Sequence, residues 1–288
     1  MNHPASTALS VRKRRRLLTD RLMRATIYVC AALAVTPLLL VVYYVVLHGL
    51  PALNASFFLK DPPLPGTPGG GVRPAIVGSL IMVGLGTLIG TPIAVLCGIY
   101  VREYAGGRAA TVVRFLIDVM AGVPTIIVGL FIYGLIVLPM GTFSAFAGAA
   151  ALSIILLPGV ARITDEMLAL VPGSVREASY ALGVPRWRTT MRVVLPAARN
   201  GVVTGIVLSV ARIAGEAAPL IFTALGNTLT STSLQQPMDA LPLRVWIYAS
   251  GPYTSWHEQA WAASLILVAL VLCFSLLMRL LFRRPTES

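Results

Sequence analysis

Charged side chains are scarce in this sequence. They make up 12% of its 288 residues, about half the share of an ordinary soluble domain, whereas 57% of the residues are hydrophobic. No Asp, Glu, Lys or Arg occurs in residues 25–47, 74–101, 119–161, 217–238 and 259–278. About 20 consecutive apolar residues are enough for a helix to cross a bilayer. The composition therefore excludes a cytosolic globular enzyme and favours an integral membrane protein.

Cysteine and lysine are also rare, and each shortage excludes a class of site. The three cysteines lie far apart inside uncharged runs, so neither a disulfide framework nor a metal site is expected. The two lysines, Lys13 and Lys60, do not complete a G-x-x-x-x-G-K-[ST] phosphate-binding loop. We therefore expect the chain to bind no cofactor, and any ATP with its Mg²⁺ to be bound by a partner. The enzyme motifs H-E-x-x-H and G-x-S-x-G are absent as well.

The long hydrophobic runs predict an all-α integral membrane protein. Small residues at helical spacing, such as Gly86 and Gly90, allow close helix packing in lipid. A turn signal at Pro139-Met-Gly-Thr142 divides the longest run in two. Six transmembrane helices are predicted, at about 25–47, 75–100, 115–138, 143–161, 201–225 and 260–281.

Basic residues are distributed unevenly between the two sides of this topology. With the N-terminus in the cytoplasm, 19 of the 23 Lys and Arg residues fall in inner segments and only Lys60, Arg73 and Arg244 in outer ones. Because basic residues near span ends stay in the cytoplasm, both termini are predicted to be cytoplasmic. The predicted parts are a basic segment 1–24, a first helix 25–47, a Pro/Gly-rich outer loop 48–73, a membrane core 74–282 with a cytoplasmic loop 162–199 and an outer loop 226–259, and a tail 283–288.

The basic run Arg12–Arg16 has two interpretations. It could bind nucleic acid, but a basic cluster directly before a hydrophobic span is typical of a topology anchor. We therefore predict contact with the lipid bilayer and none with nucleic acid. A cleaved signal peptide is disfavoured, because about 23 apolar residues exceed the 7–15 of a signal core.

The long cytoplasmic loop is predicted to form two short helices. Ser174 and Glu177 have the spacing of a capping box for the first. Gly183 suits the left-handed residue that ends this helix, and Pro185 suits the first residue of the next. Pro196 is expected to end the second helix.

The same loop carries a recognisable motif. The pattern is Glu177-Ala178-Ser179, three residues, Gly183, nine residues, Val193, one residue and then Leu195-Pro196. It resembles the EAA loop, E-A-A-x(3)-G-x(9)-I-x-L-P, of type I ABC importer permeases. In that family the loop docks on the ATPase subunit. The resemblance therefore implies that coupling to an ATPase involves Glu177, Ala178, Ser179, Gly183, Leu195 and Pro196, with Arg176, Arg186 and Arg188 at the polar rim. The alternative is an amphipathic hairpin that rests on the membrane.

Two charges, Arg212 and Glu216, fall inside the predicted fifth span. Arg212 is about 16 Å from the start of that span at 1.5 Å per residue, where an arginine costs at least about 2.5 kcal/mol. Glu216 lies one turn away and can pair with it. The pair could simply pin helices together, or Arg212 could bind a passing oxyanion such as phosphate through its planar donors while the anion displaces Glu216. Asp118, near the start of the third span, could join these two charges, but a local pair with Arg114 is the favoured prediction.

Three segments resemble the PstA family of permease subunits of phosphate-specific ABC importers. They are Arg212-Ile-Ala-Gly-Glu216 with the residues that follow, Gly122-Val-Pro-Thr to Phe131, and Gln236-Pro-Met-Asp to Leu243, within a similarity over about residues 20–282. The resemblance implies a type I permease bundle in a bacterial plasma membrane that passes phosphate by Arg212 and Glu216. It also implies a homologous second permease, an ATPase dimer and an extracytoplasmic phosphate-binding protein as partners.

Other functions stay open at this point. The substrate could be another oxyanion, such as sulfate, phosphonate or molybdate, which need not use an arginine with a glutamate one turn away. An ion-driven secondary transporter would need no EAA loop. Glu216 could also pair with a residue of the second permease instead of with Arg212.

Overall fold

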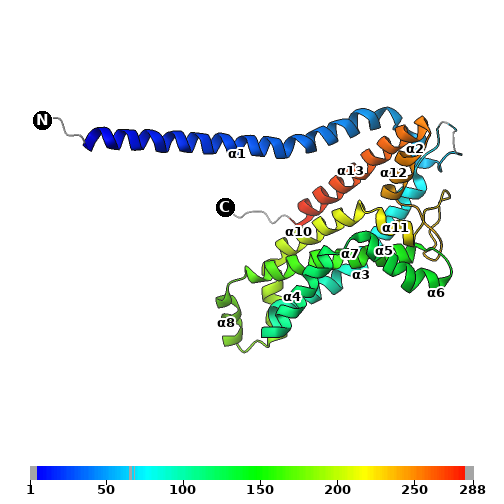
Figure 1. The fold of residues 1–288 in the computed structure, drawn as a ribbon. Helices are drawn as coiled ribbons and strands as arrows, with labels where there is room; N and C mark the ends of the chain where they lie inside the picture. Colours follow the sequence, from blue (N-terminus) through cyan, green and yellow to red (C-terminus); the bar gives the residue numbers. More distant parts are fainter. Residues whose placement is uncertain (1–4, 65–66, 68, 283–288) are drawn as a thin grey trace. The chain divides into compact units, whose positions relative to one another are not determined.

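The computed structural model describes residues 5–64, 67 and 69–282, which form helices joined by loops (Figure 1). The chain divides into two compact units, Met1–His48 and Gly49–Ser288. Apart from one isolated bridge between Leu225 and Met238, the described residues contain no β-structure. The predicted all-α class is confirmed. The predicted tail 283–288 lies outside the described residues.

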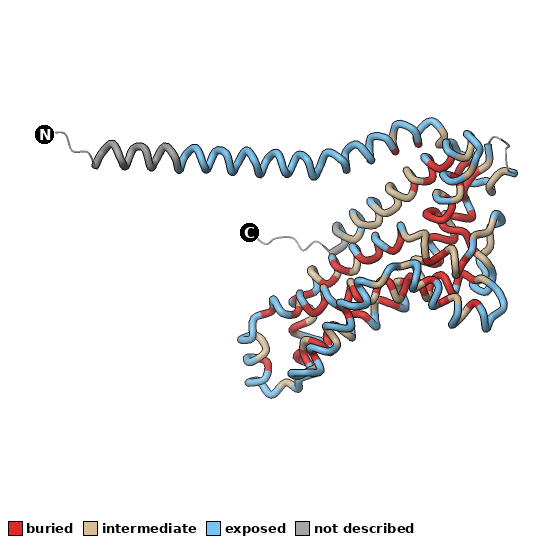
Figure 2. The backbone as a smooth tube through the Cα atoms, in the orientation of Figure 1, coloured by how far each residue is buried: buried red, intermediate tan, exposed pale blue. Residues whose placement is uncertain are grey.

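The first unit belongs to one long helix, α1 (Ala5–Gly49). Its described side chains are almost all exposed although they are largely apolar (Figure 2), as expected of a helix that faces lipid. The sequence predicts a boundary at residue 24 between a basic segment and a span. The helix is continuous through this point, because arginine and leucine are good helix formers and no proline or glycine interrupts them there, so the boundary stays a prediction about the membrane surface.

Among the described residues, five helical segments are long and apolar enough to cross a membrane, or six if one bent pair counts as a span, in agreement with the six predicted. In the second unit these are α3 (Arg73–Ile99), α7 (Ala145–Ala169), α10 (Leu195–Ala214), α13 (Thr254–Phe282) and the bent pair of α4 (Gly107–Gly122) with α5 (Thr125–Ile132). Three π-helical turns are seen in the described residues. η2 (Tyr100–Tyr104) extends α3, and η3 (Tyr133–Val137) leads from α5 to α6 (Leu138–Met140). η4 (Thr190–Val194) precedes α10.

The packing of α3 on α7 forms the centre of the second unit. A Cβ atom at Gly86 would lie 2.9 Å from the carbonyl oxygen of Ala149, and one at Gly90 would lie 2.9 Å from Oγ of Ser153. The two backbones can approach this closely only because both positions lack a side chain. The close packing predicted from these glycines is confirmed, and the fully buried Leu152 lies in the hydrophobic core beside the contact.

Two of the predicted continuous spans are interrupted. The third was predicted over 115–138, but α4 and α5 are bent by 97° at Val123 and Pro124. Pro124 causes the break because its ring cannot follow a preceding helical turn. The fifth was predicted over 201–225, but α10 ends at Ala214, and the short helix α11 (Ala218–Thr223) follows after three residues.

Part of the region 162–199, predicted as a loop between the fourth and fifth spans, is continuous with the flanking helices. α7 continues to Ala169, and the short helices α8 (Gly173–Ala181) and α9 (Arg186–Thr189) follow. α9 passes through η4 directly into α10, so residues 186–214 form one helical segment. The expectation that Pro196 ends the second helix is wrong: it lies in the first turn of α10, where the missing N–H is tolerated, and the wider π turn before it accommodates the ring.

The predicted outer loops contain helices of their own, η1 (Leu50–Ala52), α2 (Ala55–Leu59) and α12 (Leu241–Ser250). A buried ion pair fixes α12: Nε of Arg244 donates to Oδ2 of Asp239 over 2.6 Å, and the two side chains are 6% and 0% exposed. Burial raises the pKa of Asp239 to about 6, although the positive charge of Arg244 acts in the opposite direction. This segment is therefore a fixed part of the fold.

The topology predicts which positions a membrane-impermeant thiol reagent can reach. In a variant without native cysteines, Thr67→Cys and Ser233→Cys should react in intact cells, because both positions are exposed in outer segments. Gly106→Cys should react only after the membrane is opened. Asp239→Cys should stay unlabelled, because this outer position is 1% exposed. Labelling of Gly106→Cys in intact cells would contradict the orientation.

Candidate functional site

Arg212 lies in the last turn of α10, directly before the break in the fifth span. Its Nε is 4.0 Å from Oε1 of Glu216, which lies in the break. The structure thus places the two predicted intramembrane charges together, but at a helix end and not in the middle of a continuous helix. The partial negative charge of a helix C-terminus favours a cation at this position.

Thr125 is a third polar side chain at this site, and it is not among the site residues predicted from the sequence. Its Oγ1 donates to Oε2 of Glu216 over 3.2 Å. The break at Pro124 makes Thr125 the first residue of α5 and turns it toward the break after α10. Pro124 was the available signal, since a proline inside an apolar run marks a new helix start.

A cavity of about 240 Å³ opens beside Arg212 and Thr125. This volume is below the 300–1,000 Å³ of sites for drug-sized molecules and suits a small ligand. The Arg212 side chain is 61% exposed, so most of its donors are available. Charge interactions are stronger beside apolar walls than in water, which favours a small anion here. Besides the two polar residues, the walls include Met120, Val123, Val128, Phe131, Ile155 and Pro158.

The helices α8 and α9 form a compact elbow, which we define as residues 173–189. Gly183 lies between them with a φ of +74°, as the sequence predicts, because a left-handed residue here requires glycine. Ser179 is buried and its Oγ lies 2.8 Å from Oγ1 of Thr189. Of the predicted coupling residues, Glu177 and Ala178 are exposed on the elbow, whereas Ser179 holds its two helices together.

Two further predictions for this region differ from the structure. Ser174 makes no capping hydrogen bond, because α8 already begins at Gly173 after Pro172. Pro185 precedes α9 as its cap and is not its first residue. Leu195 is half-buried against the hydrophobic cluster around Val194, and Pro196 is exposed in α10. These last two residues therefore belong to the span and not to the elbow.

The tip of the elbow carries large apolar side chains that the motif did not reveal. Leu182 is 84% exposed and Trp187 is 54% exposed, and the guanidinium of Arg188 lies 5.1 Å from the ring of Trp187. Exposed side chains of this size are typical of a surface that binds another protein. The available signal was the presence of large apolar residues on either side of Gly183 in a segment rich in polar residues.

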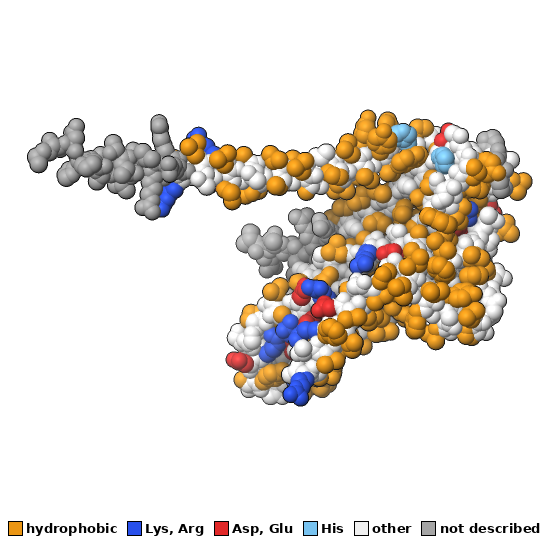
Figure 3. Space-filling model, in the orientation of Figure 1, with side chains coloured by type: hydrophobic (Ala, Val, Ile, Leu, Met, Phe, Trp, Pro, Cys, Tyr) orange, Lys and Arg blue, Asp and Glu red, His pale blue; other side chains and the backbone are white. Residues whose placement is uncertain are grey.

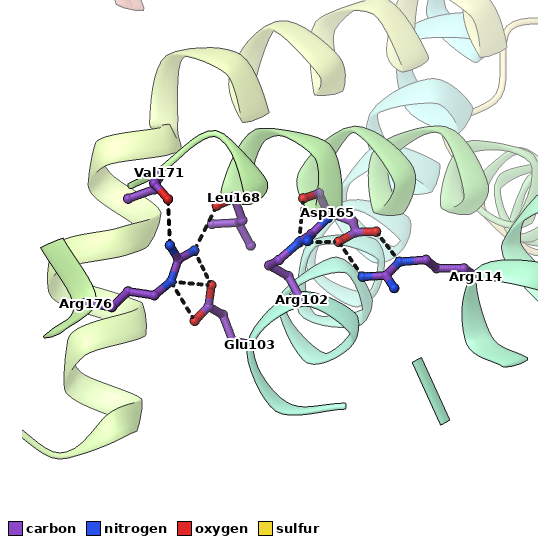
Figure 4. A network of polar contacts seen from close by, with 7 residues as sticks. All are labelled: Arg102, Glu103, Arg114, Asp165, Leu168, Val171 and Arg176. Carbon is purple, nitrogen blue, oxygen red and sulfur yellow. Dashed lines mark hydrogen bonds and ion pairs between the residues drawn. The ribbon is translucent and has the colours of Figure 1, made fainter. Parts of the chain in front are cut away.

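Two of the three arginines predicted for the polar rim bind Glu103, although Arg186 is itself exposed. The guanidinium of Arg176 binds the carboxylate of Glu103, with Nη2 2.7 Å from Oε1 (Figure 4). Nη2 of Arg186 donates to the main-chain carbonyl of Glu103. The rim prediction is wrong for Arg176, which pairs with the buried carboxylate of Glu103, whereas Arg186 stays exposed.

The predicted local pair of Asp118 with Arg114 is also wrong. Arg114 makes a bidentate contact with Asp165, at 2.7 and 3.2 Å, and Asp118 lies 3.3 Å from Arg162. Asp165 is the less exposed carboxylate, so it gains more from a bidentate partner. Figure 3 shows these charges gathered at the end of the second unit that carries α4 and α8, beside hydrophobic flanks.

Comparison with known proteins gives consistent matches over most of the chain. The model of a family described as binding-protein-dependent transport system inner membrane component matches residues 90–287. The phosphate transport system permease protein PstA of Haemophilus influenzae is 42% identical over 265 residues, which cover 92% of this chain and 94% of that protein. PstA of Xylella fastidiosa is 46% identical over 238 residues, covering 82% and 83%.

A solved structure gives the same fold. A chain of a bacterial alginate ABC transporter, crystallised with its alginate pentasaccharide-bound periplasmic protein, matches with a TM-score of 0.64 at 15% identity. The match covers 96% of this chain and 97% of that one. At this identity the likeness concerns the fold alone.

The packing of α5 on α11 holds Thr125 beside Glu216, and this can be tested with two glycines. A Cβ atom at Gly129 would lie 2.6 Å from Cα of Pro219, whereas no described atom lies within 4 Å of a Cβ at Gly134. Gly129→Ala should destabilise the protein by about 1–3 kcal/mol through overpacking. Gly134→Ala should be neutral or stabilising by up to roughly 1 kcal/mol, since alanine favours helix. Thermal unfolding of the purified protein measures both, and equal effects would contradict the packing.

Proposed function

The chain belongs to the binding-protein-dependent transport system inner membrane components, and we propose that it is a permease subunit of an ATP-driven importer of inorganic phosphate. The observation that supports phosphate as the substrate is the 42% identity, over 92% of the chain, to a phosphate transport permease. The chain is a multi-pass protein of the plasma membrane. On this proposal it forms half of the translocation path and has no ATPase site of its own.

The proposal assigns the remaining tasks to separate partners. A homologous second permease completes the path, and an extracytoplasmic phosphate-binding protein delivers the substrate. A dimer of ATPase subunits binds ATP with Mg²⁺ and supplies the free energy. The proposal is supported by the family match, whose description names a binding-protein-dependent system, and by the exposed apolar tip of the elbow at Leu182 and Trp187.

In the proposed mechanism Arg212 receives phosphate from the outer side and Glu216 gives way to it. The separation of 4.0 Å is too long for a direct hydrogen bond between the two side chains, so the pair is loosely held. A phosphate oxyanion can instead accept two parallel hydrogen bonds from the guanidinium, which are stronger. The exchange therefore keeps Arg212 paired while phosphate passes. Thr125 loses its bond to Glu216 and can donate to the ligand.

A pair whose only role was to pin helices would have a different geometry. The Asp239–Arg244 pair in the same chain has the geometry of a structural pair, with 2.6 Å between Nε and Oδ2 and almost complete burial. Arg212 and Glu216 are farther apart and more exposed, and Arg212 lines the cavity. This contrast supports the translocation role over the structural one.

The elbow is proposed to dock on the ATPase and to move Arg212 through a single helix. Residues 186–214 form one helical segment, with the elbow at one end and Arg212 at the other. At 1.5 Å per residue Arg186 and Arg212 are about 39 Å apart, so the segment reaches from the cytoplasmic elbow to the intramembrane site. A displacement of α9 is therefore carried to Arg212 without a flexible joint.

Replacing Arg212 tests the anion role. Arg212→Leu should keep membrane abundance, because losing a charge makes insertion easier, but should reduce phosphate uptake to background. Arg212→Lys should retain part of the uptake, since it keeps the charge and loses the planar donors. Thr125→Val should lower uptake more than Thr125→Ser, which keeps the hydroxyl. The measurement is uptake of labelled phosphate per assembled complex in cells without other phosphate transporters.

Two results would count against this role and this substrate. Parental uptake by Arg212→Leu would show that the pair with Glu216 is structural. Transport of labelled sulfate or molybdate, and not of phosphate, by the unmodified complex would replace the proposed substrate.

The left-handed Gly183 tests the coupling role of the elbow. Gly183→Val should cost about 1–2 kcal/mol in backbone strain and tilt α8 relative to α9, reducing the ATPase retained with the permease by roughly tenfold. Gly173→Ala is the matched control, because it lies in the same elbow with no described atom within 4 Å of its Cβ and no positive φ. Co-purification of the ATPase with the permease measures both. Full retention by Gly183→Val would argue against docking through the elbow.

A further inference from the structure

The π turn η2 at the end of α3 carries two adjacent charged residues with different partners. Arg102 and Glu103 follow each other in the chain, and Glu103 is 5% exposed. A carboxylate buried to this degree is strongly unfavourable unless it is paired and hydrogen-bonded. Its partners therefore reveal which elements η2 holds together.

Glu103 binds the elbow from both of its helices. Arg176 of α8 places Nε 3.2 and 3.3 Å and Nη2 2.7 Å from the Glu103 carboxylate oxygens. Arg186 of α9 donates to the main-chain carbonyl of Glu103 and its guanidinium lies 5.2 Å from the ring of Tyr104. The elbow cannot move away from η2 without leaving this carboxylate unpaired.

The guanidinium of Arg176 also fixes the end of α7. Its Nη1 donates to the carbonyl of Val171 over 2.7 Å, and its Nη2 donates to that of Leu168 over 2.8 Å (Figure 4). These carbonyls lie at the C-terminal end of α7, where helix carbonyls lack partners within the helix. Arg176 therefore connects α8, η2 and α7 through one rigid planar group.

Asp165 joins the same turn to the third span. Arg102 of η2 lies 2.7 Å from Oδ1 of Asp165, and Arg114 of α4 donates to Oδ2 over 2.7 Å. The Asp165 side chain is 11% exposed, so this contact is also largely removed from water. The half-helix α4 leads from Arg114 to the break before Thr125.

We propose that Glu103 and Asp165 are positioning residues that transmit elbow movement through η2 to α3, α4 and α7, and so to Thr125 at the site. This inference rests on the proposed function, because it assumes an ATPase that moves the elbow. It adds a second route beside the continuous helix that ends at Arg212. The two routes meet at the hydrogen bond between Thr125 and Glu216.

The test uses the full complex in proteoliposomes, with the binding protein and phosphate enclosed inside and ATP supplied to the ATPase outside. Glu103→Gln and Asp165→Asn keep the side-chain volume and remove the charge. Both variants should retain basal ATP hydrolysis per assembled complex. The stimulation of hydrolysis by binding protein with phosphate should fall about tenfold or more. Arg102→Gln is the milder variant, because it leaves Asp165 paired with Arg114, and it should lose less.

Arg162→Gln is the matched control. It breaks ion pairs with Asp118 and Glu166 at the same end of the bundle, but these side chains are 52–60% exposed, so stimulation should be unchanged. The exchange Glu103→Arg with Arg176→Glu should not restore stimulation, because the carbonyls of Leu168 and Val171 would lose their donor.

The outcomes separate the inference from the function on which it rests. Parental stimulation in Glu103→Gln and Asp165→Asn would overturn the inference. An equal fall of basal and stimulated hydrolysis would also overturn it, since it would show residues that only hold the chain together. Absence of phosphate-dependent stimulation and uptake in the unmodified complex would instead refute the proposed function.

Discussion

The satisfaction of backbone polar groups in a medium without water is the constraint on which this structure depends. Ending a helix inside a membrane frees N–H and C=O groups, and such backbone is tolerated only where protein or a cavity surrounds it. Here two helices break side by side, at Pro124 and after Ala214, and α5 packs closely on α11 at Gly129. Each break supplies the other with a polar neighbour, and the cavity with Arg212 and Thr125 exists because the two breaks coincide.

The chain uses ion pairs of one chemical type in three different settings. Asp239 and Arg244 are almost completely buried and fix an outer helix. Glu103 and Arg176 are nearly as buried, but their hydrogen bonds extend to three separate elements. Arg212 and Glu216 are loosely paired beside a cavity. Burial and hydrogen bonding, and not the residue types, therefore distinguish a structural pair from one that a ligand can open.

The features that sequence predicts well are those set by composition and by neighbouring residues. The number of spans, the glycine packing of α3, the left-handed Gly183 and the proximity of Arg212 to Glu216 all follow from runs or spacings within one segment. Contacts between distant segments could not be predicted in this way. Arg176 and Glu103 are 73 positions apart, and Arg114 prefers Asp165 over its neighbour Asp118 because folding places a less exposed carboxylate beside it. Pro196 was misjudged because a π turn, which has no clear sequence signal, accommodates it.

The exposed tip of the elbow also bears on the life of the chain before assembly. Leu182 is 84% exposed, and under the topology described above it faces the cytoplasm and not lipid. Until another protein covers it, chaperones and proteases can bind such a surface, because they recognise the exposed apolar segments of incompletely folded proteins. On the proposed function, copies made in excess of the ATPase would keep Leu182 uncovered and be degraded preferentially. The exposed leucine at a helix end would then link the lifetime of this chain to the supply of its partner.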